Sequence, residues 1–492
     1  MRKFSRREIL QDIFRAGVVA GFSTAAAPLK LPGALWGSFA TPRPHAISAG
    51  DEALLDEMQR AALLFFWEQA NPATGLVKDR SLASGPDSRE VASIAATGFG
   101  LTALCIASER GYLEKAKARD RALTTLRFLA QQMETHHGFY YHFVNFRTGE
   151  RAWKCELSSI DTALLFCGVL TCRAFFQDDE ISKLASQIYE RADWPWFLNG
   201  GKTLSMGWKP ESGFLTARWD IYCELMMIYL LGLGSPTHPL PAETWEAWKR
   251  PEFDYYHLHY IGSPAPIFVH QYSQAWFDFR GKHDRYANYF ENSILATQAH
   301  RLFCLDLSPR FHDYDSELWG ISSSDSANGY VAWGGPPTMG PIDGSVVPCA
   351  AAGSLPFLPD ESLRVLRNIR ENYGERGWNR YGFVDAFNPL TNWYDPDVIG
   401  IDLGISLLMA ENLRSGFVWE TFMKNEEMRR GMERAGFKPD SMMKDKPSSK
   451  PSAHVRRDQN FDLPYQPLES ANFDQSERFR GKVQLDAPLA NL

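Results

Sequence analysis

Blocks of apolar residues at helical spacing follow one another along most of the chain from Asp51 onward. In the first block, residues 53–69, apolar side chains recur three and four positions apart, which is typical of an amphipathic helix. Strand-like alternation is scarce. Further helices are predicted over 93–110, 115–134, 158–176, 180–192, 219–233, 241–249, 285–305, 345–354, 360–373 and 401–414. The sequence therefore predicts an all-α fold.

Short and long connections alternate between these blocks, as they do between stacked helical hairpins. The long connections are rich in Gly, Pro, Trp, Tyr and Asp, and they span 71–92, 136–157, 194–218, 306–344 and 374–400. Roughly twelve helices would make six hairpins that close into a barrel, an (α/α)6 toroid, with the long loops at one end. No repeat of fixed period is present, so the stacking is inferred from the order of the elements.

The two ends of the chain differ from the middle. Residues 1–45 are interpreted as a twin-arginine signal peptide and linker, because Ser5-Arg6-Arg7-Glu8 precedes an uncharged, apolar stretch. We expect export to the periplasm or the medium. A membrane anchor is disfavoured because the apolar stretch is short and is broken by polar residues and Pro28. Residues 46–437 form the predicted globular domain, and the polar segment 438–492 is predicted to be a disordered tail.

Composition narrows the classes of function. The net charge of -7 disfavours nucleic acid and anionic membrane as partners, and the 15 Trp residues suggest stacking surfaces in addition to core. Seven cysteines, an odd number, lie mostly in helix-like apolar runs. We expect buried free thiols, and no Cys-x-x-Cys or Cys/His spacing predicts a zinc site.

One candidate site precedes the predicted helix 158–176. Ser158 and Asp161 fit a capping box, so the helix should begin at Ser158 or Ser159. Trp153 and Glu156 then lie on the loop just before it, where a scaffold displays an aromatic platform and a carboxylate to a ligand. The alternative is that Asp161 is only a cap and Glu156 a solvated loop acid.

Two further carboxylates stand at the beginnings of predicted helices. Glu224 is flanked by Cys223, Leu225 and Met226. Desolvation in such an apolar neighbourhood raises a carboxyl pKa toward that of a general acid, although a helix acid pointing to solvent is equally compatible with the pattern. Asp402 stands at the start of the last strong helix.

The long loops combine hydrogen-bonding side chains with aromatic rings, as sugar-binding sites do. The segment around Trp319 and Tyr330 is interpreted as too polar and Gly-rich for a core. The candidate sugar contacts are Trp153, Trp208, His270, Gln271, Tyr272, Trp319, Tyr330 and Trp393, and the loop acids are Asp325, Asp385, Asp395 and Asp397. Together they predict an acidic, aromatic cleft.

Several long motifs in this order carry a family resemblance. They are Phe66-Trp67-Glu68-Gln69, Thr97-Gly98-Phe99-Gly100-Leu101, Ser158-Ser159-Ile160-Asp161-Thr162, Gly234-Ser235-Pro236-Thr237-His238-Pro239, Phe268-Val269-His270-Gln271-Tyr272-Ser273, Ala351-Ala352-Gly353-Ser354-Leu355-Pro356-Phe357 and Tyr381-Gly382-Phe383-Val384-Asp385. Over about residues 50–437 the chain resembles the bacterial glycoamylase-like proteins of glycoside hydrolase family 144. The resemblance implies a barrel of six helical hairpins and hydrolysis of β-1,2-glucan with inversion at the anomeric carbon.

The resemblance also implies roles. An inverting glycosidase needs a general acid and a general base roughly 6.5–9.5 Å apart. By position on the motifs, Glu224 is assigned as the acid and Asp402 as the base, with Glu156 as rival for either role and Asp161 orienting it or binding sugar. No metal or cofactor is needed for this chemistry. Two alternatives stay open: a transglycosylase acting on β-glucans and a non-catalytic periplasmic β-glucan-binding protein. Endo or exo action and the oligomeric state are open too.

Overall fold

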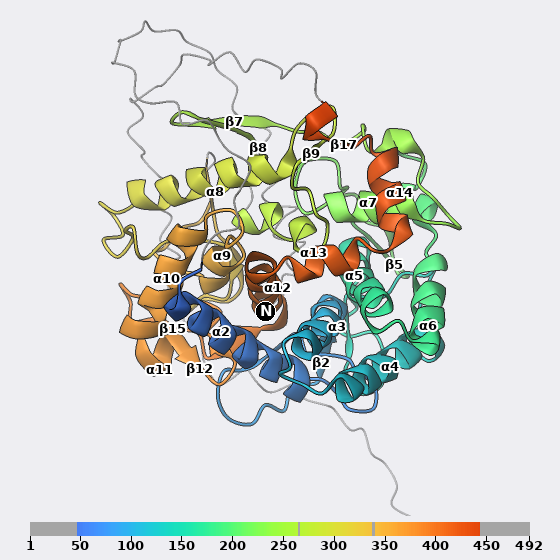
Figure 1. Ribbon diagram of the computed structural model, residues 1–492, viewed down its shortest axis with the longest axis horizontal. Coiled ribbons are helices and arrows are strands. Elements are labelled where there is room, and N and C mark those ends of the chain that lie inside the picture. The colour runs from blue at the N-terminus through green and yellow to red at the C-terminus, as the bar shows by residue number, and fades with distance from the viewer. Residues whose placement is uncertain (1–46, 264–265, 337–339, 443–492) are drawn as a thin grey trace, which may run out of the picture. The chain divides into compact units, whose positions relative to one another are not determined.

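Helices dominate the computed structural model, which describes residues 47–263, 266–336 and 340–442 (Figure 1). The described helices are α2 (Ala49–Glu68), α3 (Ile94–Glu109), α4 (Lys115–Gln131), α5 (Ser159–Phe176), α6 (Asp179–Glu190), α7 (Met226–Gly234), α8 (Tyr289–Asp306), α9 (Pro348–Ala352), α10 (Pro359–Asn372), α11 (Gly374–Gly377), α12 (Gly400–Arg414), α13 (Phe417–Phe422) and α14 (Glu426–Arg434). The helix-rich fold predicted from periodicity is confirmed.

The helices form an inner and an outer layer. Helices α3, α5 and α12 are buried on nearly every side, whereas α6 buries Ile181, Leu184, Ala185, Ile188 and Tyr189 and exposes Asp179, Lys183 and Gln187. Helix α3 packs against α2, α4, α5 and α12, and α5 packs against α6 and α7. Figure 1 shows α3, α5 and α12 inside a rim that contains α2, α4, α6 and α10.

Helix α5 is long and apolar enough to cross a membrane, but 83% of it is buried inside the protein. Such a helix is the core helix of a folded domain, since the neighbouring helices cover its apolar surface.

Short antiparallel strand pairs lie in the long loops. Strand β2 (Val91–Ser93) pairs with β3 (Phe143–Asn145), β4 (Leu157–Ser158) with β5 (Gly207–Lys209), and β1 (Arg80–Leu82) with β16 (Asp397–Ile399). Strands β2, β4 and β16 run directly into α3, α5 and α12. The pairs thus hold the first turns of these inner helices to neighbouring loops, and the long loops provide the pairing partners.

The other strands are equally short. They are β6 (Gly213–Phe214), β7 (Glu252–Tyr255), β8 (Leu258–Ile261), β9 (Lys282–His283), β10 (Ser323–Ser324), β11 (Val331–Ala332), β12 (Trp378–Asn379), β13 (Gly382–Phe383), β14 (Phe387–Asn388), β15 (Trp393–Tyr394) and β17 (Lys438–Pro439).

Two predicted helices differ from the structure. The block 219–233 becomes helical only from Met226, because Trp219 and Tyr222 bond through their backbone N–H groups to the carbonyls of Leu204 and Lys249. The block 241–249 contains a three-residue 3-10 helix, Ala242–Thr244, followed by further tight turns. Helices α13 and α14 were not predicted. In these places tertiary pairing outweighs the local pattern.

The sequence also led to predictions for the cysteines and for the two ends of the chain. All seven cysteines are buried free thiols, as predicted. The signal-peptide prediction lies outside the described residues. Of the predicted tail, residues 438–442 are described, and Lys438–Pro439 pairs with β9; the rest lies outside the described residues.

Candidate active site

The start of α5 is built as its sequence predicts. Ser158 is the N-cap, and its Oγ accepts a hydrogen bond from the N–H of Asp161 at 3.0 Å. The Ser158 hydroxyl in turn donates to the carboxylate of Asp161. Glu156 lies before the helix but is only 4% exposed, so it is not a solvated loop acid.

His142 joins two of the predicted carboxylates. Its Nδ1 lies 3.3 Å from Oε1 of Glu156, and its Nε2 lies 3.4 Å from Oδ1 of Asp161. All three residues are buried. The imidazole stacks on Phe143 with ring centroids 3.7 Å apart, which fixes its plane. Glu156 and Asp161 are therefore oriented as one unit.

Glu224 lies in the turn immediately before α7 and is 2% exposed. Oγ of Ser273 donates to the backbone carbonyl of Glu224 at 2.7 Å and accepts from the N–H of Met227 at 3.1 Å. A serine distant in sequence thus caps α7 and fixes the backbone of Glu224. The flanking Cys223, Leu225 and Met226 are buried as well, and the burial of Glu224 excludes a solvent-facing helix acid.

Asp402 lies in the first turn of α12 and is 6% exposed. Its Oδ1 is 3.5 Å from the hydroxyl of Tyr272 and 3.3 Å from Sγ of Cys349. Since Ser273 contacts the Glu224 turn and Tyr272 contacts Asp402, the segment 272–273 lies between the proposed acid and the proposed base. Asp402 is also at the N-terminal end of the inner helix α12, where the helix dipole favours a negative charge.

A second layer of acids lies behind Asp402. The carboxyl groups of Asp385 and Asp402 lie within hydrogen-bonding range of each other, and Oδ2 of Asp385 accepts from the N–H of Asp325 at 2.8 Å. Burial, followed by the charges of Asp402, Asp395 and Asp325, raises the pKa of Asp385 well above its usual range. Burial and the charge of Asp325 likewise raise the pKa of Asp395 to about 8. Burial therefore favours the neutral form of both groups.

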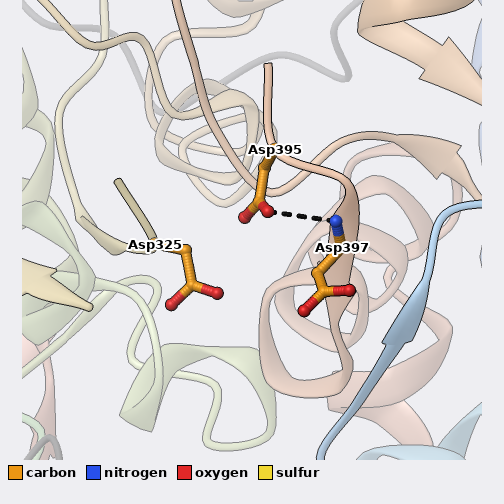
Figure 2. A group of neighbouring side chains, drawn as sticks. All are labelled: Asp325, Asp395 and Asp397. Carbon is orange, nitrogen blue, oxygen red and sulfur yellow. Dashed lines mark hydrogen bonds between the residues drawn. The ribbon is translucent and has the colours of Figure 1, made fainter. Parts of the chain in front are cut away.

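Asp325, Asp395 and Asp397 come together from two long loops (Figure 2), with carboxylate oxygens within 4.8 Å of one another. A divalent cation would require this spacing. However, Asp325 pairs with Arg80 at 2.5 Å, and Asp397 accepts two hydrogen bonds from Arg89 at 2.6 and 2.7 Å. A cation would have to compete with two guanidinium groups, so we interpret the cluster as an ion-pair network that ties loop 71–92 to loops 306–344 and 374–400.

The predicted aromatic contacts differ in exposure. Trp153 is 56% exposed, and Trp208, Tyr330 and Trp393 are partly exposed. Trp153 has its centroid 5.1 Å from the ring of Phe143, which places it beside the His142 unit. Trp208 stacks on His136 at 4.6 Å and pairs through its backbone with Leu157. Trp153 and Trp208 therefore flank the segment that carries Glu156.

Three residues that were predicted to contact sugar instead make contacts inside the protein core. Nδ1 of His270 lies 3.0 Å from the hydroxyl of Tyr222, and burial lowers its pKa to about 3. Nε2 of Gln271 donates to Ala350 and Ser354. Trp319 is fully buried near His300. Trp319 is thus no surface platform, and the prediction that its segment is too polar for a core is wrong: adjacent apolar residues fold inward.

A shallow hollow lies at the other end of α5. It is lined by Arg173, Ala174, Gln177, Ser182, Lys424, Asn425, Glu426 and Glu427. Arg173 bonds to Asn425 and Glu427 there, so its guanidinium holds α5 to the start of α14. The candidate site is at the opposite end of α5.

Sequence reasoning missed the groups that hold the site together. No role was predicted for His142 or Arg89. Asp385 and Asp395 were named as loop acids without a role. No local pattern predicts a contact between Arg89 and Asp397, which are 308 positions apart. The sequence offered one clue, the many acids in the long loops. Buried acids require basic partners, so basic residues were to be expected beside them.

Comparisons with known proteins show which family this chain resembles. Residues 216–426 match the family model named Glycoamylase. A protein of Parabacteroides distasonis, named exo beta-1,2-glucooligosaccharide sophorohydrolase (non-reducing end), is 27% identical over 423 residues, or 78% of this chain. The chain spans 58% of the length of that relative.

Solved structures are similar over nearly their full length. One, from Bacteroides uniformis and described provisionally as a glucoamylase, is 30% identical with a TM-score of 0.74, and the match covers 79% of this chain and 98% of the other. The endo-beta-1,2-glucanase of Chitinophaga pinensis, solved with sophorotriose and glucose, is 26% identical with a TM-score of 0.75 and coverages of 80% and 99%.

Proposed function

The chain belongs to the bacterial glycoamylase-like family, and from this premise we propose that it is a glycoside hydrolase acting on β-1,2-glucan. The names of two relatives support the substrate, since one is a sophorohydrolase acting on β-1,2-glucooligosaccharides and the other an endo-β-1,2-glucanase. The substrate is thus a β-1,2-linked polysaccharide or oligosaccharide, and product analysis decides between endo and exo action.

The observation that carries the proposal is that Glu224, Asp402 and Glu156 are all buried where loops enter helices α7, α12 and α5. In the proposed inverting reaction, Glu224 protonates the glycosidic oxygen while Asp402 removes a proton from the water that attacks the anomeric carbon. The hydroxyl of Tyr272 orients Asp402. Glu156, held by His142, is the alternative for either role, and Asp161 orients it or binds sugar.

Two further proposals concern the chain as a whole. The inner layer of α3, α5 and α12 and the outer layer of α2, α4, α6 and α10 support an (α/α)6 toroid, with the long loops at the end that carries the acids. The twin-arginine pattern in residues 1–45 supports export to the periplasm or the medium, which is consistent with a polysaccharide substrate.

The function is tested with the purified mature protein on linear β-1,2-glucan. Wild type is compared with Glu224→Gln, Asp402→Asn and Glu156→Gln, and with Glu180→Gln, a surface carboxylate, as the matched control. We expect short products of inverted configuration from wild type and the control. Loss of an acid or base typically lowers kcat by about 10²- to 10⁴-fold, so Glu224→Gln and Asp402→Asn should each do so with unchanged circular dichroism.

Other outcomes point to other functions. Release of a single small product indicates exo action. Longer products that form without net gain of reducing ends indicate a transglycosylase. Binding of the glucan without any bond cleavage indicates a binding protein. If Glu156→Gln removes activity while Glu224→Gln retains it, the roles of these two residues are reversed.

A further inference from the structure

We infer that Asp385 is a positioning residue: its carboxyl is a neutral acid that donates a hydrogen bond to Asp402 and keeps Asp402 ionised as the base. This inference rests on the proposed function, in which Asp402 activates water. It goes beyond the acid and base assignment because it explains why a buried carboxylate can act as a base beside other acids.

The geometry around Asp385 fits a carboxylic acid. Oδ2 of Asp385 accepts a hydrogen bond from the N–H of Asp325 at 2.8 Å, as the carbonyl-like oxygen of a protonated carboxyl does. Oδ1 of Asp385 is buried and accepts no hydrogen bond from a donor among the described residues. The Asp385 side chain nevertheless lies within hydrogen-bonding range of the Asp402 carboxyl. Two carboxylates are both acceptors, so a proton must lie between them.

The surroundings decide which partner holds that proton. Asp402 lies in the first turn of the 15-residue helix α12, where the helix dipole favours the charged form. Its Oδ1 also faces two donors, Tyr272 from the segment between the 3-10 helices Ile267–His270 and Ser273–Ala275, and Cys349 from α9.

Asp385 instead faces acids. Burial and the nearby charge of Asp325, from loop 306–344, disfavour a charge on Asp385. The cation of this cluster, Arg80, pairs with Asp79 and Asp325 rather than with Asp385. The proton therefore belongs to Asp385, and the charge belongs to Asp402.

The test compares Asp385→Ala and Asp385→Asn with Asp395→Asn as the matched control. Asp395 is a second buried neutral acid of the same cluster, whose charged neighbours are Asp325, Asp397 and Arg80. In the pH profile of kcat/KM, the acid limb reports protonation of the base. Asp385→Ala should move this limb upward by about one to two pH units, because the carboxylate loses a charge-assisted hydrogen bond.

The conservative variant Asp385→Asn distinguishes a residue that positions Asp402 from a residue that only supports the loop. Asp385→Asn keeps an N–H donor toward Asp402 and should leave the acid limb near its wild-type position, as should Asp395→Asn. If Asp385→Ala lowers kcat without moving the acid limb, Asp385 only supports the loop and the inference is overturned.

A spectroscopic readout makes the inference independent of turnover. In the infrared difference between wild type and Asp385→Asn at neutral pH, a neutral Asp385 gives a C=O band of a protonated carboxyl. Absence of the band overturns the inference whatever the activity. If the band is present but wild type cleaves no β-1,2-glucan, the proposed function fails while the shared proton stands.

Discussion

Gly168 of α5 lies directly against the backbone carbonyl of Gly98 of α3. A Cβ at position 168 would be 2.1 Å from that oxygen, and a Cβ at position 98 would be 2.3 Å from the carbonyl oxygen of Leu164. The two buried helices therefore touch backbone to backbone. This contact fixes how the first turns of α3 and α5, and the loops that precede them, are spaced.

Substitution of Gly168 by Ala should destabilise the protein in spite of the higher helix propensity of Ala. The methyl group meets rigid backbone, so α3 and α5 must separate, and overpacking of this kind costs about 1–3 kcal/mol. Gly50→Ala is the control, because a Cβ there has its nearest neighbour at 3.9 Å. Urea unfolding measures both. Equal stability of the two variants would show that the helices adjust freely.

Replacement of Arg89 by Lys should weaken the network between the long loops. Lys cannot donate two parallel hydrogen bonds to Asp397 and also bond to Asp87, so we expect a loss of about 1–3 kcal/mol. Arg127→Lys is the matched control, because Arg127 makes the same two-pronged contact with Glu180 on the surface, where ion pairs contribute about 0–1 kcal/mol.

The ion pair between Arg89 and Asp87 predicts that the protein loses stability at acidic pH. Burial alone would raise the pKa of Asp87, but hydrogen bonds from Arg89 outweigh it and lower the pKa from 3.8 to about 2. A depressed carboxyl pKa stabilises the folded state above the unfolded pKa, so this contribution disappears as the pH falls from 3.8 to about 2. Denaturant unfolding across this range should show a smaller pH dependence for Arg89→Lys. An unchanged slope would contradict the assignment.

Asp395 should have the opposite effect at higher pH. Its pKa is raised from 3.8 to about 8, mainly by burial, so the unfolded chain releases this proton at a lower pH than the folded one. The free energy of unfolding therefore falls as the pH rises from about 4 toward about 8. Asp395→Asn, which never ionises, should be more stable relative to wild type at pH 8 than at pH 4. Parallel curves for the two proteins would rule this out.

His142 should couple to Glu156 in stability. Replacing His142 by Phe keeps the stacking on Phe143 but leaves Glu156 and Asp161 without their shared partner, which makes these buried carboxylates costly. Adding Glu156→Gln should recover part of the loss. A double-mutant cycle from urea unfolding measures the coupling, for which about 0.5–3 kcal/mol is typical of residues in contact. A coupling of zero would mean that His142 acts on neither acid.

What the sequence determined by itself is local. Apolar periodicity predicted most helices, including α5 and its start, because the Ser158 capping box and the buried stripe lie within a few residues of one another. The order of motifs indicated the family, and the position of Glu224, Asp402 and Glu156 before or at the start of helices was predicted from their neighbours in the chain.

Only the tertiary structure decided which of these side chains meet. Trp319 is buried although its loop is polar, and α7 begins late because residues before it pair with Leu204 and Lys249. Asp385 contacts Asp402, Arg89 contacts Asp397 and His142 contacts Asp161 across other elements. Burial and partner charge set the protonation of a carboxyl, and both depend on segments distant in sequence, so no local pattern could predict them.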